Sequence, residues 1–116
     1  MSSKHVYKVI DAQVTVSALT NYDLINCPDV NGSVSIYMDI DATSTGTATV
    51  DVIQSPDGES ATTVVPSQVA SPFSAIAGGN NDLISVDLIP FAEHIGLRVT
   101  PSGGDIVINK LWLIIK

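Results

Sequence analysis

Cysteine, basic residues and aromatic residues are all scarce in this sequence. Cys27 is the only cysteine among 116 residues, which excludes an internal disulfide scaffold and a cysteine-clustered zinc site. Five Lys and Arg against twelve Asp and Glu give a formal net charge of -7. This is the wrong sign for neutralising phosphates, and we therefore expect no nucleic-acid partner.

Long apolar runs are missing as well. The first residues lead directly into an alternating segment and not into the continuous apolar stretch of a signal peptide. The apolar C-terminal run, residues 110–116, is too short to cross a bilayer. We expect a protein that is made in the cytoplasm and has no membrane partner.

Charged side chains make up 15% of the chain, whereas soluble domains usually have about 25%. The 22 Ser and Thr residues allow a simple interpretation, a domain coated with hydroxyl groups. The alternative, which we favour, is that another subunit covers part of the surface.

The residues that are abundant favour β-strands. Val, Ile and Thr account for 36 of the 116 residues, while Leu contributes 7. Between closely spaced turns, apolar residues recur at every second position, as in strands with one buried face. In the segment 34–41 the alternation places Val34, Ile36, Met38 and Ile40 on one face and Ser35, Tyr37, Asp39 and Asp41 on the other.

About eight such strands fit into the chain, and no helix of normal length does. We predict an all-β fold, a single antiparallel β-sandwich domain over residues 1–116 of the jelly-roll or Greek-key type. We expect segment 47–54 to pair with segment 34–41 as a hairpin, because a short Thr/Ser/Gly turn joins them. The lack of a cysteine pair favours the jelly roll over an antibody-type domain.

No cluster of residues indicates a reaction or a cofactor. His5 and His94 have no local partner motif, and no G-x-S-x-G elbow or phosphate-binding loop occurs. Asp39 and Asp41 share one strand face, and Asp51 lies across the expected hairpin, so these carboxylates are weak candidates for Ca²⁺. A solvated acidic face is the simpler interpretation, and we predict a non-enzymatic protein without metal or cofactor.

The C-terminal segment 105–115 is apolar on both of its alternating faces. Strict alternation places Ile106, Ile108, Lys110, Trp112 and Ile114 on one face and Val107, Asn109, Leu111, Leu113 and Ile115 on the other. Either the segment is a central strand whose second face lies under a loop, or Trp112, Leu111 and Leu113 contact another chain. We favour the interface, and we expect Trp112→Ala to unfold the domain or to break its assembly.

A succession of strands and turns carries a resemblance to a known group of proteins. Residues 45–58 read TGTATVDVIQSPDG, and they are followed by ISVDL at 84–88 and HIGLRVTP at 94–101. Over residues 34–116 this pattern resembles small jelly-roll-like β-sandwich proteins of tailed bacteriophage virions. In that group a strand commonly ends in a Ser-x-Asp-Gly turn, and an I-x-L-R-V strand precedes a glycine turn. The chain departs from the pattern at Glu59, where an aromatic residue often follows the Asp-Gly turn.

The resemblance implies a virion structural protein, such as a capsid decoration or auxiliary head protein that stabilises the capsid lattice. Its partners would be the major capsid protein or other virion proteins, and a homotrimer would suit the threefold points of an icosahedral shell. The alternative function is a carbohydrate-binding module that recognises a host surface glycan. Its stacking platform would consist of Tyr7, Tyr22, Tyr37 and Trp112.

Overall fold

The described part of the chain is built from antiparallel β-strands. The computed structural model describes residues 5–26, 33–55, 65–66, 73–87 and 94–115, and these ranges hold ten strands and no helix, hence none that could cross a membrane. The strands are β1 (His5–Ile10), β2 (Val14–Val16), β3 (Thr20–Asn26), β4 (Ser33–Ile40), β5 (Thr47–Ser55), β6 (Val65–Pro66), β7 (Phe73–Ala77), β8 (Asn81–Asp87), β9 (His94–Ser102) and β10 (Ile106–Ile115). Their β-branched residues favour this extended conformation.

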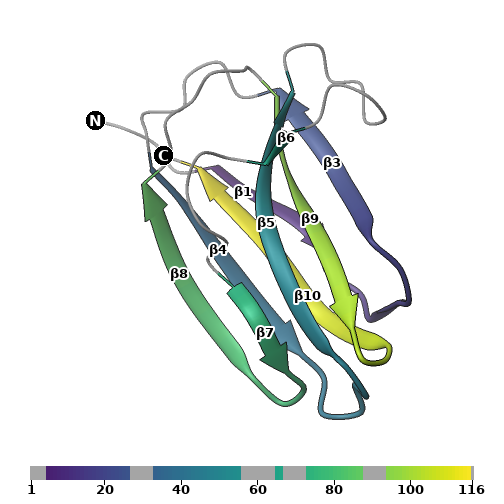
Figure 1. Ribbon diagram of the computed structural model, residues 1–116. Helices are drawn as coiled ribbons and strands as arrows, with labels where there is room; N and C mark the ends of the chain where they lie inside the picture. The colour runs from purple at the N-terminus through teal and green to yellow at the C-terminus, as the bar shows by residue number, and fades with distance from the viewer. Residues whose placement is uncertain (1–4, 27–32, 56–64, 67–72, 88–93, 116) are drawn as a thin grey trace.

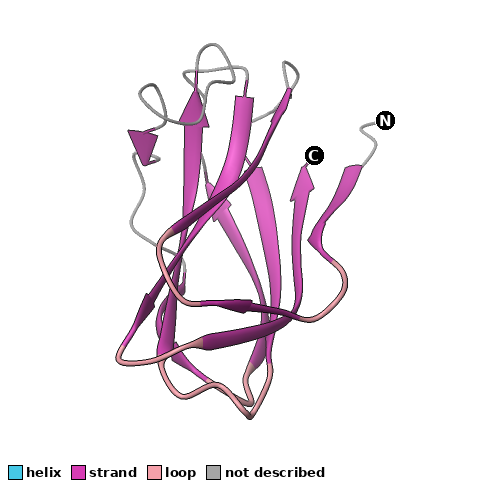
Figure 2. Cartoon of the chain, turned by 90° about the vertical axis from the view of Figure 1, so that its right-hand side faces the viewer, coloured by secondary structure: helices cyan, strands magenta, loops and turns pink. Residues whose placement is uncertain are grey.

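The strands form two sheets that face each other (Figures 1 and 2). Sheet A has the order β1-β10-β4-β8, with β2 also paired to β10, and sheet B has the order β3-β9-β5-β6, with β7 also paired to β5. We count β1 with β2, and β6 with β7, each as one interrupted strand. The orders then become 1-8-3-6 and 2-7-4-5, the connectivity of a jelly roll. The predicted all-β sandwich is confirmed.

The hydrophobic core lies between the two sheets. Its fully or almost fully buried residues include Val34, Ile36, Met38 and Ile40 from β4, Ala48, Val50 and Val52 from β5, Ile95, Leu97 and Val99 from β9, and Ile106, Ile108, Leu111 and Leu113 from β10. Each fully buried Val, Ile or Leu side chain contributes roughly 1.5–3 kcal/mol. The inward face predicted for the segment 34–41 is therefore confirmed, and this interlayer core is the main source of stability.

The hairpin expected between segments 34–41 and 47–54 is wrong. β4 pairs with β10 and β8 in sheet A, whereas β5 pairs with β9, β6 and β7 in sheet B, so the turn between them crosses from one sheet to the other. Hydrogen bonds to the start of β10 hold this crossing. The backbone N of Asp41 donates to the Val107 carbonyl at 2.8 Å, and that of Thr45 donates to the Asp105 carbonyl at 3.0 Å. Alternation identifies the buried face of a strand but not the strand beside it.

The alternation of β10 is interrupted by one extra residue. Its pairing with β4 shifts register between Ile108 and Lys110, so Asn109 forms a β-bulge. Side chains after the bulge change faces, and Leu111 therefore points into the same core as Ile108, while Trp112 does not. Because of this bulge, the expectation of strict alternation along the strand is wrong.

Side-chain hydrogen bonds fasten the bulge to its two neighbouring strands. The Nε2 atom of Gln13 donates to Oδ1 of Asn109 at 2.8 Å. The Nδ2 atom of Asn109 donates in turn to Oδ1 of Asp41 at 3.2 Å. These bonds connect the break between β1 and β2, the bulge in β10 and the end of β4.

Candidate functional site

The most distinctive surface lies on the outer face of sheet A. Cross-strand register aligns Lys8 of β1, Trp112 of β10, Tyr37 of β4 and Leu83 of β8 across the sheet. We call these four residues the outer row. Leu83 is 57% exposed, so the row includes a large apolar side chain in contact with solvent.

Trp112 lies at the centre of the outer row. Its ring is 5.4 Å from the ring of Tyr37 between centroids, and the two planes are tilted by 54°. The ammonium groups of Lys8 and Lys110 lie 4.9 Å and 5.6 Å from the centroid of the Trp112 ring, within cation–π range. A shallow hollow of about 270 Å³ is lined by Tyr37, Leu83, Lys110, Trp112 and Ile114. The surface is thus mainly apolar, with two cations beside the ring of Trp112.

Two of the three residues predicted to contact another chain are enclosed instead. Leu111 and Leu113 are 0% exposed and belong to the core between the sheets. Their assignment to an interface is wrong, because the bulge at Asn109 turns both side chains inward. Trp112 is half-buried and lines the hollow on the outer face, so it alone of the three is available to a partner.

The four aromatic residues considered for a sugar platform do not form one surface. Tyr7 and Tyr22 pack against the core, and burial raises the pKa of the Tyr22 hydroxyl. Tyr37 alone joins Trp112 on the outer face of sheet A. A platform of four rings is therefore wrong, and a pair of rings remains.

The aspartates considered for Ca²⁺ are separated by the two-layer fold. Asp39 lies on β4 in sheet A, in register with Lys110 of β10. Asp51 lies on β5 in sheet B, in register with Arg98 of β9. Among the described residues, no group of three His, Cys, Asp or Glu side chains could hold a metal ion. The crossing of the chain between β4 and β5 accounts for this separation.

Asp41 stabilises the turn that follows β4. Its Oδ2 atom accepts hydrogen bonds from the backbone N of Thr43 at 3.0 Å and from the Thr43 hydroxyl at 2.5 Å. These bonds, with the one from Asn109, lower the pKa of the Asp41 carboxyl. The carboxylate therefore acts as an acceptor within its own turn.

The structure places the two histidines at the starts of strands in different sheets. His94 begins β9 in sheet B, and His5 begins β1 in sheet A. Cys27 lies outside the described residues.

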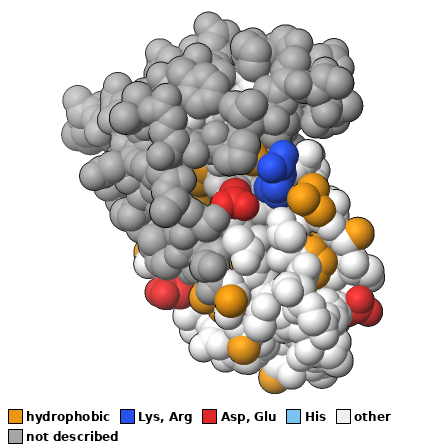
Figure 3. All heavy atoms as spheres, in the orientation of Figure 1, with side chains coloured by type: hydrophobic (Ala, Val, Ile, Leu, Met, Phe, Trp, Pro, Cys, Tyr) orange, Lys and Arg blue, Asp and Glu red, His pale blue; other side chains and the backbone are white. Residues whose placement is uncertain are grey.

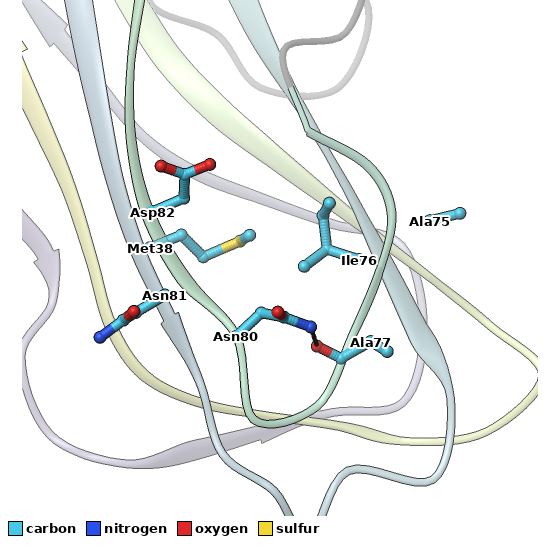
Figure 4. Close-up of a pocket in the computed structure, with 7 residues that line it drawn as sticks. All are labelled: Met38, Ala75, Ile76, Ala77, Asn80, Asn81 and Asp82. Carbon is cyan, nitrogen blue, oxygen red and sulfur yellow. Dashed lines mark hydrogen bonds between the residues drawn. The ribbon is translucent and has the colours of Figure 1, made fainter.

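A second hollow lies between β7 of sheet B and strands β4 and β8 of sheet A (Figure 4). It measures about 320 Å³, and the fully buried Met38 is one of the residues that line it. The Nδ2 atom of Asn80 donates to the Ala77 carbonyl at 3.0 Å, and Oδ1 of Asp82 accepts a bond from the Leu83 backbone N at 2.8 Å. Two of the three polar side chains that line the hollow, those of Asn80 and Asp82, therefore bond to nearby backbone.

Solved structures are similar to this chain, although no protein-family model and no curated protein matches the sequence. A chain of infectious bursal disease virus, Gt strain, is 12% identical over 96% of this chain, with a TM-score of 0.52. A chain of the VP2 subviral particle of that virus is 17% identical over 97%, with a TM-score of 0.47. This chain spans about a third, 32%, of each viral chain. The K1 cleaved adhesin domain of Lys-gingipain from Porphyromonas gingivalis W83 is 13% identical over 97% of this chain and 98% of that domain, with a TM-score of 0.48. The likeness to the Gt strain chain, at a TM-score above 0.5, shows the shared β-sandwich fold.

Proposed function

We propose that this protein is a structural component of a virus particle, a jelly-roll subunit that binds other virion proteins and catalyses no reaction. In its finer form, it is a decoration or auxiliary head protein of a tailed bacteriophage, which stabilises the lattice of the major capsid protein. The observation that carries the proposal is the outer row. Sheet A buries a complete core on one face and still presents Trp112, Tyr37 and Leu83 on the other.

The composition of this surface supports contact with protein. Tyr and Trp supply a large contact area with few rotatable bonds, and they are enriched where proteins bind each other. Charged side chains are sparse elsewhere, as the described part of the face in Figure 3 shows. The jelly-roll connectivity, together with the fold shared with a viral chain at a TM-score of 0.52, supports the viral part of the proposal.

The experiment is reconstitution on virus shells. Particles of the virus that carries the gene should contain this protein in a fixed ratio to the major shell protein, as measured by quantitative mass spectrometry. Particles made without the gene should lose their contents at a lower temperature and recover when the purified protein is added. Absence of the protein from the particles would refute the proposal.

Two leucines of nearly equal exposure provide a matched control for this experiment. Leu83→Asp places a charge in the outer row, whereas Leu19→Asp places the same charge between β2 and β3. The exposed fractions of the two side chains are 57% and 55%. Leu83→Asp should fail to restore the shells and Leu19→Asp should restore them. Equal restoration by both variants would show that the outer row is not required for attachment to the shell.

A second candidate function is the binding of a host surface glycan, which the contact between Tyr37 and Trp112 favours. Sugars stack on bare aromatic faces, but the ammonium groups of Lys8 and Lys110 already lie over the Trp112 ring. A sugar would have to displace them, and this candidate is therefore the weaker one. Binding on a glycan array that is lost in Tyr37→Ala would support it. Tyr22→Ala is the control, because its ring packs against the core.

A further inference from the structure

The outer face of sheet A carries a pattern that matches itself. β10 and β4 are the two central strands in the order β1-β10-β4-β8. Across this central pair, Trp112 is level with Tyr37, and Lys110 is level with Asp39. An aromatic ring thus lies beside an aromatic ring, and a cation lies beside an anion.

We propose that this face packs against the same face of a second copy of the chain. The twofold axis runs parallel to the strands, midway between β10 and β4. Rotation about such an axis leaves every residue at the same height along the strand direction. It places β10 of one copy over β4 of the other. Lys110 then faces the partner's Asp39, and Trp112 faces the partner's Tyr37, with every contact made twice. The inference rests on the proposed function in one respect: the second copy is the virion protein that the outer row binds, and the resulting pair is the unit that attaches to the shell.

Charge complementarity selects a second copy as the occupant. A net charge of -7 makes an arbitrary contact between two copies repulsive. Two of the five basic residues, Lys8 and Lys110, lie on this face around Trp112. The twofold arrangement brings Lys110 opposite a carboxylate, which favours association and determines its register.

The apolar part of the face provides the driving force for this contact. Leu83 and Val6 are 57% and 49% exposed. Val6 is in register with Ile114, which lines the hollow. Removing these side chains from water on association is favourable in proportion to the apolar area covered.

The proposed contacts are also compatible with the angle that sheet twist produces between the strands of two sheets packed face to face. Aligned sheets usually cross at about 30°. The contacts proposed between Trp112 and Tyr37, and between Lys110 and Asp39, belong to the two strands next to the axis, where such a rotation moves atoms least. Lys8 and Leu83 lie one strand farther out and form the rim.

A contact between identical surfaces closes as a dimer. The homotrimer expected for the threefold points of a shell would need two different surfaces that meet head to tail. Because the outer face matches itself about a twofold axis, the structure favours the dimer. The two assemblies differ in mass, which makes the inference directly measurable.

The experiment uses two charge reversals, Lys110→Asp and Asp39→Lys, with mass measured by sedimentation equilibrium at micromolar concentration. Wild-type protein should have about twice the chain mass of 12.1 kDa. Each variant alone opposes like charges at two symmetric positions, and its dissociation constant should rise by at least about tenfold. A 1:1 mixture of the two variants should associate, because each reversed charge then meets its opposite across the interface.

Asp105→Lys is the matched control for Asp39→Lys. It makes the same change in net charge at an exposed residue directly before β10. In its mixture with Lys110→Asp, a mixed pair keeps one like-charged contact, so mixed pairs should be fewer than in the mixture of the two reversals. A monomeric or trimeric wild type, a single variant that dimerises normally, a mixture of the two reversals that fails to associate, or equal rescue by the control would each overturn the inference. A dimer that never binds virus shells would refute the proposed function and leave this inference intact.

Discussion

Leu113 and Ile114 are neighbours in β10, and truncating each of them tests the bulge at Asn109. Leu113 is 0% exposed in the core, whereas Ile114 is half-buried and lines the hollow on the outer face. Strict alternation counted from the buried Ile108 would reverse these two environments. The relative cost of Leu113→Ala and Ile114→Ala therefore distinguishes a bulged strand from a regular one.

The magnitudes follow from the two environments. Leu113→Ala should lower the free energy of unfolding by about 3–5 kcal/mol, because it removes apolar contacts and leaves a cavity between two packed sheets. A domain of this length is stable by about 6–17 kcal/mol, so this loss is a large fraction of the total. Ile114→Ala removes three carbons from a partly hydrated side chain, and at about 0.8 kcal/mol per fully buried CH₂ it should cost only about 1 kcal/mol.

Urea unfolding followed by far-UV circular dichroism measures both free energies. All variants are compared at one protein concentration, because association adds to apparent stability. The comparison also requires that the slope of the unfolding free energy against urea concentration is the same in all variants. Ile108→Ala, on the other side of the bulge, is the control and should cost about as much as Leu113→Ala. A larger loss for Ile114→Ala than for Leu113→Ala would refute the bulged strand.

Three further substitutions test other parts of the structure. Asp41→Asn should lower the urea midpoint at neutral pH, because bonds from Thr43 lower the pKa of Asp41 below its ordinary 3.8. This stabilisation is present above that value and is lost as the pH falls through the lowered pKa, so the urea midpoints of wild type and variant should converge in acid. A difference between the midpoints that stays constant with pH would contradict this explanation. Gly46→Ala should cost about 1–3 kcal/mol in the same assay, since overpacking strains the backbone. Its Cβ would lie 2.5 Å from the Gly104 carbonyl oxygen, so an unchanged midpoint would disprove that close approach. Trp112→Ala should lower the free energy of unfolding by about 1–2 kcal/mol, which is less than the loss expected for an enclosed Trp, and the variant should remain folded. A circular dichroism spectrum typical of an unfolded chain would place Trp112 in the core.

Local patterns in the sequence were sufficient to predict the fold class and the inward faces of the regular strands. The buried side of the segment 34–41 was predicted correctly, because a strand exposes alternate side chains to opposite environments. The abundance of β-branched residues and the closely spaced turns led to the β-sandwich for the same reason. These are properties of a few consecutive residues, and they can be recognised without knowledge of the rest of the chain.

The tertiary structure decided which strands are neighbours and which side chains share a surface. The turn after β4 crosses between the sheets, and the single extra residue Asn109 moves Trp112 to the outer face. Trp112 could be singled out as the one tryptophan in an apolar strand, but Lys8 and Leu83 join it only through register with distant strands. The register between such strands is set when the two sheets pack around one core. It therefore cannot be predicted from composition, periodicity or spacing along the chain.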